Sequence, residues 1–122
     1  MANYVDGFVL AVQRARVEDY RRIAEIAGKV WLEYGALEYR ECVAEDVKVG
    51  KVTSFPQAVK LEDDEVVVFS WIVYRSREER DRINAQVMAD PRITASLEGK
   101  TPPFDMQRLI FGGFTTLVAL DA

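Results

Sequence analysis

Residues 66–74 read VVVFSWIVY, and this stretch decides the fold. The side chains of a β-strand point alternately to its two faces. Here both alternating sets are apolar apart from Ser70, which predicts a central strand that is covered on both sides. Residues 4–13, YVDGFVLAVQ, repeat this pattern around Asp6 and predict a second strand of the same kind.

Helical segments follow each of these two strands. Residues 17–34 place apolar side chains three and four positions apart, which predicts an amphipathic helix that ends at Gly35. Residues 76–79, SREE, are typical of a capping box that begins a second helix. The Asp-Pro pair at 90–91 supplies an N-cap followed by proline in the first turn, so this helical region restarts there.

Two further strands complete the pattern. Residues 36–43, ALEYRECV, alternate in a way that suits a strand with one solvated face. Residues 108–120, RLIFGGFTTLVAL, predict the last strand, weakened or bulged at Gly112 and Gly113. The loop between the second and third strands contains residues 54–56, SFP, which predict a short helical turn.

The order β-α-β-β-α-β predicts an α+β, ferredoxin-like fold in a single domain over residues 1–122. Such a fold has a four-stranded antiparallel sheet with helices on one face. Because two of the strands are apolar on both sides, the open face also needs a cover. A second copy of the chain supplies it in a two-fold pair. We therefore expect a homodimer whose sheets face each other.

Composition excludes several classes of site and partner. The 122 residues include 16 Lys plus Arg, 20 Asp plus Glu, no His and one Cys, for a net charge of −4. Histidine-based nucleophiles and metal sites are therefore excluded. The acidic balance argues against a nucleic-acid partner. The apolar runs are too short to span a membrane. We expect a cytoplasmic protein without metal or cofactor, in which Cys42 is buried or half-buried and residues 62–65, EDDE, form a solvated turn.

Two polar residues inside the apolar strands are candidate site residues. Burial of Asp6 would raise the pKa of its carboxyl and suit it to general acid–base catalysis. An ion pair with arginine, or a hydrogen bond to a backbone NH, is the structural alternative. Ser70 either binds a ligand oxygen or satisfies a local carbonyl group.

Aromatic residues and glycines give a second set of candidates for ligand binding. Trp71 and Phe111, together with neighbouring phenylalanines, suit a pocket for a flat apolar molecule, although they are equally suited to the core. Trp71 and Ser70 point to opposite faces, so only one of them faces a given pocket. Gly113 either lets a ligand or a partner backbone approach or marks a bulge.

Five blocks of sequence resemble the DUF1428 family, in the same order and spacing: Tyr4–Val9, Gly50–Phe55, Val67–Trp71, Met88–Arg92 and Arg108–Phe114. The resemblance covers nearly the whole chain. It implies a dimeric α+β barrel, which agrees with the element order, and a family without an established activity.

Three functions follow from these observations. The first is a protein that binds a small, largely apolar molecule between sheet and helices. The second, implied by resemblance to the wider superfamily, is a cofactor-free monooxygenase or isomerase that acts on a small aromatic or cyclic substrate. In that case Asp6 would handle a proton and Trp71 or a tyrosine would orient the substrate. The third is a structural or interaction dimer with no ligand.

Overall fold

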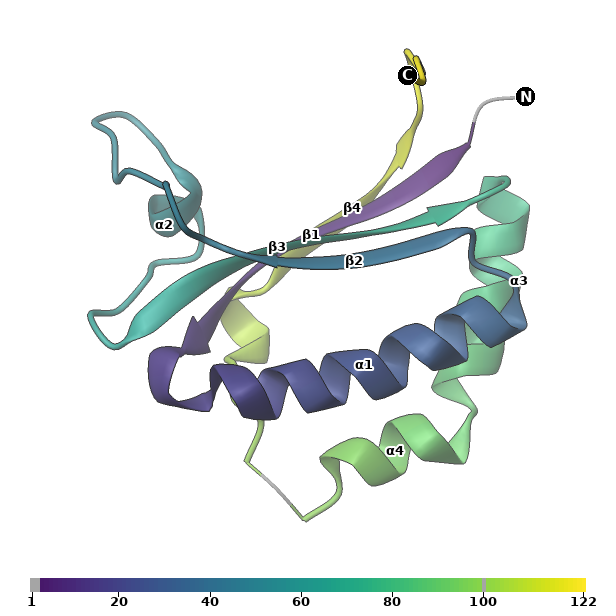
Figure 1. Cartoon of the computed structure of the whole chain (residues 1–122), viewed down its shortest axis with the longest axis horizontal. Helices are drawn as coiled ribbons and strands as arrows, with labels where there is room; N and C mark the ends of the chain where they lie inside the picture. The colour runs from purple at the N-terminus through teal and green to yellow at the C-terminus, as the bar shows by residue number, and fades with distance from the viewer. Residues whose placement is uncertain (1–2, 100) are drawn as a thin grey trace.

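A computed structural model describes residues 3–99 and 101–122. It contains a four-stranded antiparallel sheet with the order β2-β3-β1-β4 (Figure 1). The strands are β1 (Tyr4–Gln13), β2 (Glu38–Val43), β3 (Glu65–Tyr74) and β4 (Ile110–Thr115). The two strands with apolar side chains at both parities, β1 and β3, lie in the centre. This arrangement confirms the expected ferredoxin-like α+β fold.

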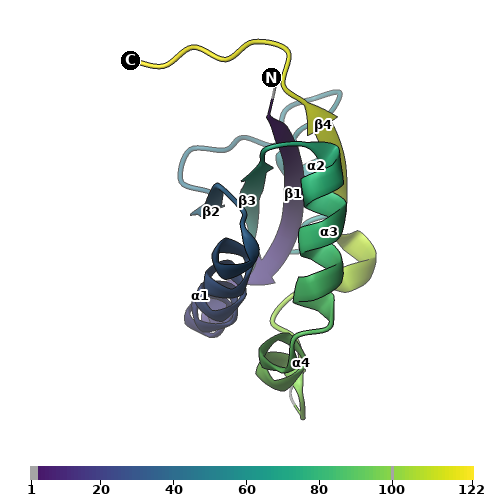
Figure 2. The ribbon, with the colours of Figure 1, turned by 90° about the vertical axis from the view of Figure 1, so that its right-hand side faces the viewer.

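The longer helices cover one face of the sheet. They are α1 (Val17–Tyr34), α3 (Arg77–Met88) and α4 (Pro91–Leu97), and Figures 1 and 2 show them on the same side. The 3-10 turns η1 (Arg14–Arg16) and η2 (Met106–Arg108) lie at the ends of connecting segments. The predicted N-caps are confirmed, because Ser76 Oγ accepts a hydrogen bond from the Glu79 NH and the Asp90 carboxylate accepts one from the Arg92 NH.

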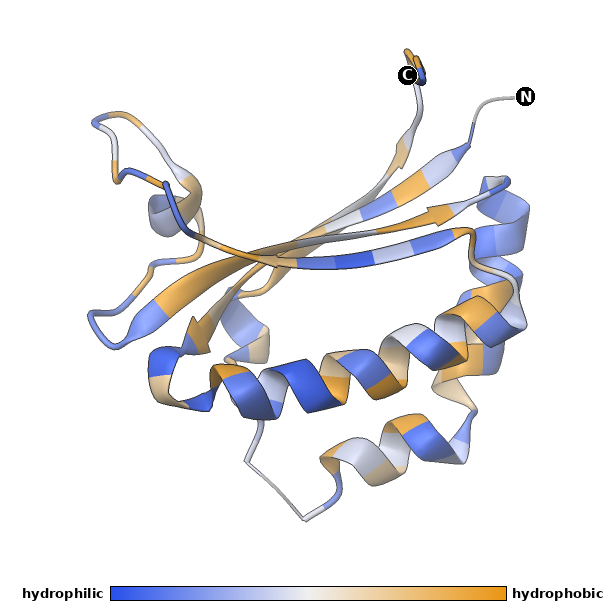
Figure 3. Ribbon diagram, in the orientation of Figure 1, coloured by the Kyte–Doolittle hydropathy of each residue, from blue (hydrophilic) through white to orange (hydrophobic). Residues whose placement is uncertain are grey.

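The main core lies between the helices and the even-numbered side chains of β1 and β3. These strands pair without interruption from Tyr4 opposite Tyr74 to Gln13 opposite Glu65, so their even positions share one face. Val12 and Tyr74 are fully buried on this face, as are Ile83 and Val87 of α3. Figure 3 shows the apolar residues gathered along β3.

The opposite, odd-numbered face of the sheet is covered at one end by the chain itself. The short helix α2 (Phe55–Ala58) lies on this side (Figure 1), and Val59 and Leu61 after it pack on Ala11 and Val67. Towards the other end the face stays open, with Phe69 and Phe114 partly exposed. We refer to this uncovered part, formed by Val5, Val9, Phe69, Trp71, Val73, Ile110 and Phe114, as the open face.

Four details of the sequence interpretation were wrong. Glu65, expected in a solvated turn with residues 62–64, is almost completely buried at the first position of β3, because its carboxylate pairs with Arg108. The last strand runs from Ile110 to Thr115 rather than from residue 108 to residue 120, because Arg108 belongs to η2 and Thr115 pairs with Tyr4, the first residue of β1. Gly112 and Gly113 pair one-to-one with β1, so there is no bulge. Cys42 is exposed, since it lies on the edge strand β2 with its side chain on the solvated side.

Candidate functional site

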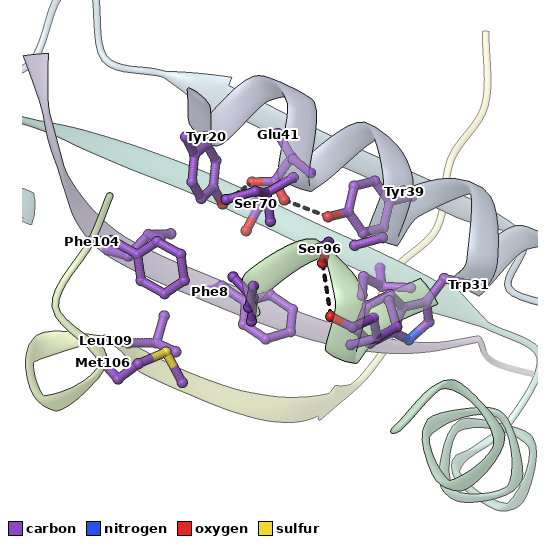
Figure 4. Close-up of a pocket in the computed structure, with 17 residues that line it drawn as sticks. Phe8, Tyr20, Trp31, Tyr39, Glu41, Ser70, Ser96, Phe104, Met106 and Leu109 are labelled. Carbon is purple, nitrogen blue, oxygen red and sulfur yellow. Dashed lines mark hydrogen bonds between the residues drawn. The ribbon is translucent and has the colours of Figure 1, made fainter. Parts of the chain in front are cut away.

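A cavity of about 210 Å³ lies between the sheet and the helices (Figure 4). Its 17 lining residues come from the side of the sheet that faces the helices, from the inner faces of α1 and α4, and from the segment that leads into β4. Most are apolar: Phe8, Leu10, Ile23, Ala24, Ala27, Trp31, Ile72, Ile93, Leu97, Phe104, Met106 and Leu109. The remaining five are Tyr20, Tyr39, Glu41, Ser70 and Ser96.

The polar part of this cavity is centred on the carboxylate of Glu41. Tyr20 of α1 donates its hydroxyl proton to Glu41 Oε1 at 2.7 Å, and Tyr39 of β2 donates to Oε2 at 2.6 Å. Ser70 lies directly opposite Glu41 in the β2–β3 register. One carboxyl group is thus held between a helix and two strands, with each oxygen bound to a different tyrosine (Figure 4).

The surroundings of Glu41 change its acidity. Burial raises the pKa of the Glu41 carboxyl above its ordinary value, and the hydrogen bonds from Tyr39, Tyr20 and Ser70 offset part of that increase. Burial and the nearby Glu41 charge also raise the pKa values of Tyr20 and Tyr39, so both phenols keep their protons. The cavity therefore contains one carboxyl group whose pKa lies above that of an exposed glutamate.

A glycine in α1 sets the position of Tyr39. A Cβ atom at Gly28 would lie 2.7 Å from Tyr39 Cδ1, so any side chain there would push against the tyrosine ring. Glycine inside a helix costs about 1 kcal/mol relative to alanine. The close approach of the ring is the local reason for glycine at this position. On the other side of the carboxylate, the Tyr20 ring packs edge-on against Phe104 with centroids 5.7 Å apart.

Asp6 is not among the residues that line this cavity. It lies on the even face of β1, almost completely buried, where its Oδ1 accepts a hydrogen bond from Arg80 Nη1 at 3.0 Å. Burial raises the pKa of the Asp6 carboxyl, and the positive charge of Arg80 opposes the increase. Arg80 also donates to the hydroxyl of Tyr4. The carboxyl therefore has a charged partner between the sheet and α3.

The predicted ligand-binding residues do not meet in one place. Ser70 lines the cavity, whereas Trp71 points to the open face and donates its indole NH to Glu38 at 2.6 Å. The opposite orientation of these two neighbours agrees with the alternation of side chains along a strand. Trp71 and Phe69 of the open face contact each other edge-to-face, and Phe69 contacts Phe55 of α2 in the same way.

Phe111 and Gly113 belong to the edge strand β4. The Phe111 ring stacks on Phe8, a residue of the cavity wall, with centroids 6.2 Å apart, but it is itself largely exposed. Gly113 lies opposite Asp6, and a Cβ atom there would overlap the ring of Tyr4. Its missing side chain thus makes room for the tyrosine that contacts Arg80.

The sequence interpretation missed Glu41 and its two tyrosines. A signal for the glutamate is present, because Glu41 occupies the same parity as Leu37, Tyr39 and Val43 in a strand whose other parity is polar. An acidic residue on the apolar side of an amphipathic strand indicates a buried carboxyl group. The contribution of Tyr20 depends on how α1 packs on β2, which the sequence pattern does not specify.

Among the described residues, no three His, Cys, Asp or Glu side chains gather closely enough to hold a metal ion. No helix within residues 3–99 and 101–122 is long and apolar enough to cross a lipid bilayer.

Three similar proteins place the chain among known structures and sequences. The "Uncharacterized protein YbaA" of Escherichia coli K12 is 49% identical, over 94% of this chain and 97% of that protein. A "Putative antibiotic biosynthesis monooxygenase" from Nitrosomonas europaea superposes with a TM-score of 0.58 at 9% identity, covering 94% of this chain and 90% of the other. A NIPSNAP family protein of unknown function from Agrobacterium tumefaciens superposes with a TM-score of 0.56 at 12% identity, covering 93% of this chain and 87% of the other.

The structural likenesses, at such low identity, show the fold alone. The sequence matches are more specific. Residues 3–106 match the family described as "Protein of unknown function (DUF1428)", and the expected family is thereby confirmed. With nearly half of its residues shared with YbaA over almost its full length, the chain belongs to the DUF1428 family.

Proposed function

We propose that the protein binds a small, largely apolar molecule in the cavity between sheet and helices, with Glu41 as its polar contact. The observation that carries this proposal is one half-buried carboxyl group, held by two tyrosines, in a largely apolar cavity of about 210 Å³. A mainly apolar cavity with a few convergent polar groups is typical of a small-molecule site. An apolar engineered cavity of about 150 Å³ takes up benzene, so the space here suits one ring with a short substituent.

The rim of the cavity supports access from solvent. Leu97 at the end of α4 and Met106 in η2 line the cavity and are 38% and 61% exposed. Both side chains therefore contact the cavity and the solvent, so the cavity is accessible at its rim.

A variant that fills the cavity tests this proposal. Ala27 of α1 lines the cavity, and Ala85 is an exposed residue of α3 that serves as a matched control. Ala27→Phe is expected to abolish the binding of ethylbenzene, measured by NMR titration of backbone amides, and Ala85→Phe is expected to leave it unchanged. Native mass spectrometry of the purified protein would identify any molecule that stays bound. Equal binding of ethylbenzene by both variants and the unmodified protein would place the ligand elsewhere.

The second candidate function is an acid–base enzyme that needs no cofactor, a monooxygenase or isomerase acting on a small aromatic or cyclic substrate. It is favoured by the raised pKa of Glu41, because a carboxyl group in an apolar cavity is suited to proton transfer. Glu41 would take the role that the sequence suggested for Asp6, and Tyr39 would orient the substrate. The name of the Nitrosomonas europaea protein supports this candidate by analogy of fold only.

We also propose that two chains pair through the open face. Phe114, Ile110 and Phe69 are 63%, 44% and 42% exposed there and form a continuous apolar surface with Trp71. Such a surface on a small protein marks an interaction site, and a second copy offers a self-complementary cover. A dimer without any ligand is the third candidate function. A cytoplasmic location stays a prediction.

The oligomeric state tests the pairing. Light scattering at micromolar concentration is expected to give twice the 13.9 kDa of one chain. Phe114→Glu on the open face is expected to yield a folded monomer, whereas Leu32→Glu, at an exposed apolar position of α1, is expected to stay paired. A monomeric unmodified protein would contradict the proposal.

A further inference from the structure

The charge of the cavity points to the class of molecule that it takes. None of its 17 lining residues, all within the described part of the chain, is Lys or Arg, and Glu41 is the single carboxylate among them. An anionic ligand would therefore find a like charge and no counter-charge. We propose that the cavity binds a small aromatic or cyclic amine in its ammonium form, paired with Glu41. This inference rests on the ligand-binding function proposed above and deepens it.

Hydrogen-bond directions support a ligand that donates protons. The hydroxyl protons of Tyr20 and Tyr39 are given to Glu41, and Ser96 Oγ donates to the Ile93 carbonyl at 2.8 Å. A hydroxyl group that donates in this way keeps its lone pairs as acceptors. These three hydroxyl groups, together with the carboxylate, therefore present acceptors to a bound molecule. An ammonium group has only donors and matches them.

The walls favour a cation with an apolar body. Phe8, Trp31 and Phe104 surround the cavity together with the two tyrosine rings (Figure 4). Aromatic faces attract an ammonium group within about 6 Å of the ring centroid, and more strongly once water is excluded. The same rings bury the apolar part of the ligand. An acceptor-lined, aromatic cavity of this kind recognises both ends of an aryl-alkyl amine.

Two basic residues line a neighbouring groove together with Glu41. Arg21 and Lys29 of α1, with Glu25 between them, line a separate outer groove between α1 and β2, and neither basic residue lines the cavity. Arg21 also pairs with Glu18 at 3.0 Å. Glu41 lines both spaces, and it is the single charged residue among the 17 that line the cavity.

Four probes of similar size separate the possible ligand chemistries. Benzylamine carries the ammonium group, benzyl alcohol a neutral donor, ethylbenzene no polar group and benzoate an anion. Backbone amide shifts of the unmodified protein at pH 7.5 give a dissociation constant for each probe and show whether residues around Ser70 and Tyr39 respond. Benzylamine is expected to bind at least about tenfold more tightly than each of the other three, a difference of about 1.4 kcal/mol.

An isosteric variant tests the role of the carboxylate. Glu41→Gln removes the charge at nearly constant volume and is expected to reduce benzylamine binding to the level of ethylbenzene. Glu38→Gln is the matched control, because Glu38 lies on the same strand with its side chain on the other face. It is expected to keep the preference for benzylamine. The four-probe comparison on the unmodified protein decides the proposal even if Glu41→Gln does not fold.

The outcomes distinguish this inference from the function on which it rests. Ethylbenzene or benzyl alcohol binding as tightly as benzylamine would refute the ammonium ligand and leave the apolar cavity in place. Benzoate binding more tightly than benzylamine would refute it as well. If none of the four probes shifts the amides around the cavity, the ligand-binding function itself is overturned.

Discussion

Arg80→Met tests how much the ion pair between Arg80 and Asp6 stabilises the fold. The two side chains form an ion pair at 3.0 Å and are only 19% and 6% exposed, respectively. Removing one partner of a buried pair leaves an unpaired buried charge, which costs about 3–5 kcal/mol. Methionine preserves much of the volume of the arginine stem, so the loss of charge dominates. We expect the free energy of unfolding at pH 7 to fall by about 3 kcal/mol.

Urea denaturation followed by circular dichroism measures this change at constant protein concentration. For a urea dependence of about 1.5 kcal/mol per M, the midpoint is expected to fall by about 2 M. The double variant Asp6→Leu with Arg80→Met removes both charges and is expected to recover most of the loss, since an apolar pair of similar volume often replaces a buried ion pair without cost. A loss below about 1 kcal/mol in Arg80→Met would refute this reasoning.

The pH dependence of stability in the same variant tests whether an unpaired Asp6 charge causes the loss. Burial already raises the pKa of Asp6 in the folded protein, and removing Arg80 raises it further. At pH values between the pKa of Asp6 in the unfolded chain and its higher pKa in the folded protein, the folded state holds a proton that the unfolded state has released. The stability of the variant therefore falls as pH rises across this range. The difference in free energy of unfolding between the unmodified protein and Arg80→Met is therefore expected to be large at pH 7 and to become smaller towards pH 4.

Three further predictions follow from other contacts. Gly28→Ala gains about 1 kcal/mol of helix propensity, but the new Cβ atom meets the Tyr39 ring. We therefore expect a net loss of stability in thermal unfolding and changed NMR shifts of Tyr39. An unchanged position of the ring would contradict this account. Tyr39→Phe leaves one oxygen of Glu41 without its donor and is expected to cost about 1–3 kcal/mol in urea unfolding, whereas no loss would show that the oxygen finds another donor. Hydrogen bonds from Arg108 hold the pKa of Glu65 below its ordinary value of 4.5, so this pair stabilises the protein above that pH and loses its contribution as pH falls below it. In an acid titration, the free energy of unfolding should therefore change less steeply with pH for Glu65→Gln than for the unmodified protein. An identical pH dependence would show that the pair does not contribute.

Most of the fold could be predicted because its decisive signals are local. The apolar residues at both parities placed β1 and β3 in the centre of the sheet, and the three-and-four spacing gave α1 its observed bounds. The end of β4 could not be predicted in the same way. Leu117, Val118 and Leu120 have the composition of a strand but lie beyond the first residue of β1, so pairing rather than propensity decides where the strand stops.

The candidate site was less predictable, because it depends on which elements meet. Ser70 could be found as the one polar residue in an apolar run. Glu41 carries a weaker signal, since glutamate in a half-exposed edge strand is common. Its significance comes from Tyr20, which is 21 positions away and reaches the carboxylate because α1 packs on β2. Likewise, the partner of Asp6 is 74 residues distant in the chain.

The two tryptophans lie on opposite faces of the sheet, with Trp31 in the cavity wall and Trp71 on the open face. Each indole therefore samples a separate compartment of one small protein. With Trp71→Phe the remaining emission reports what enters the interior, and with Trp31→Phe it reports what covers the outside. Fluorescence from these two single-tryptophan proteins can thus record occupancy and pairing as independent events, and show whether one alters the other.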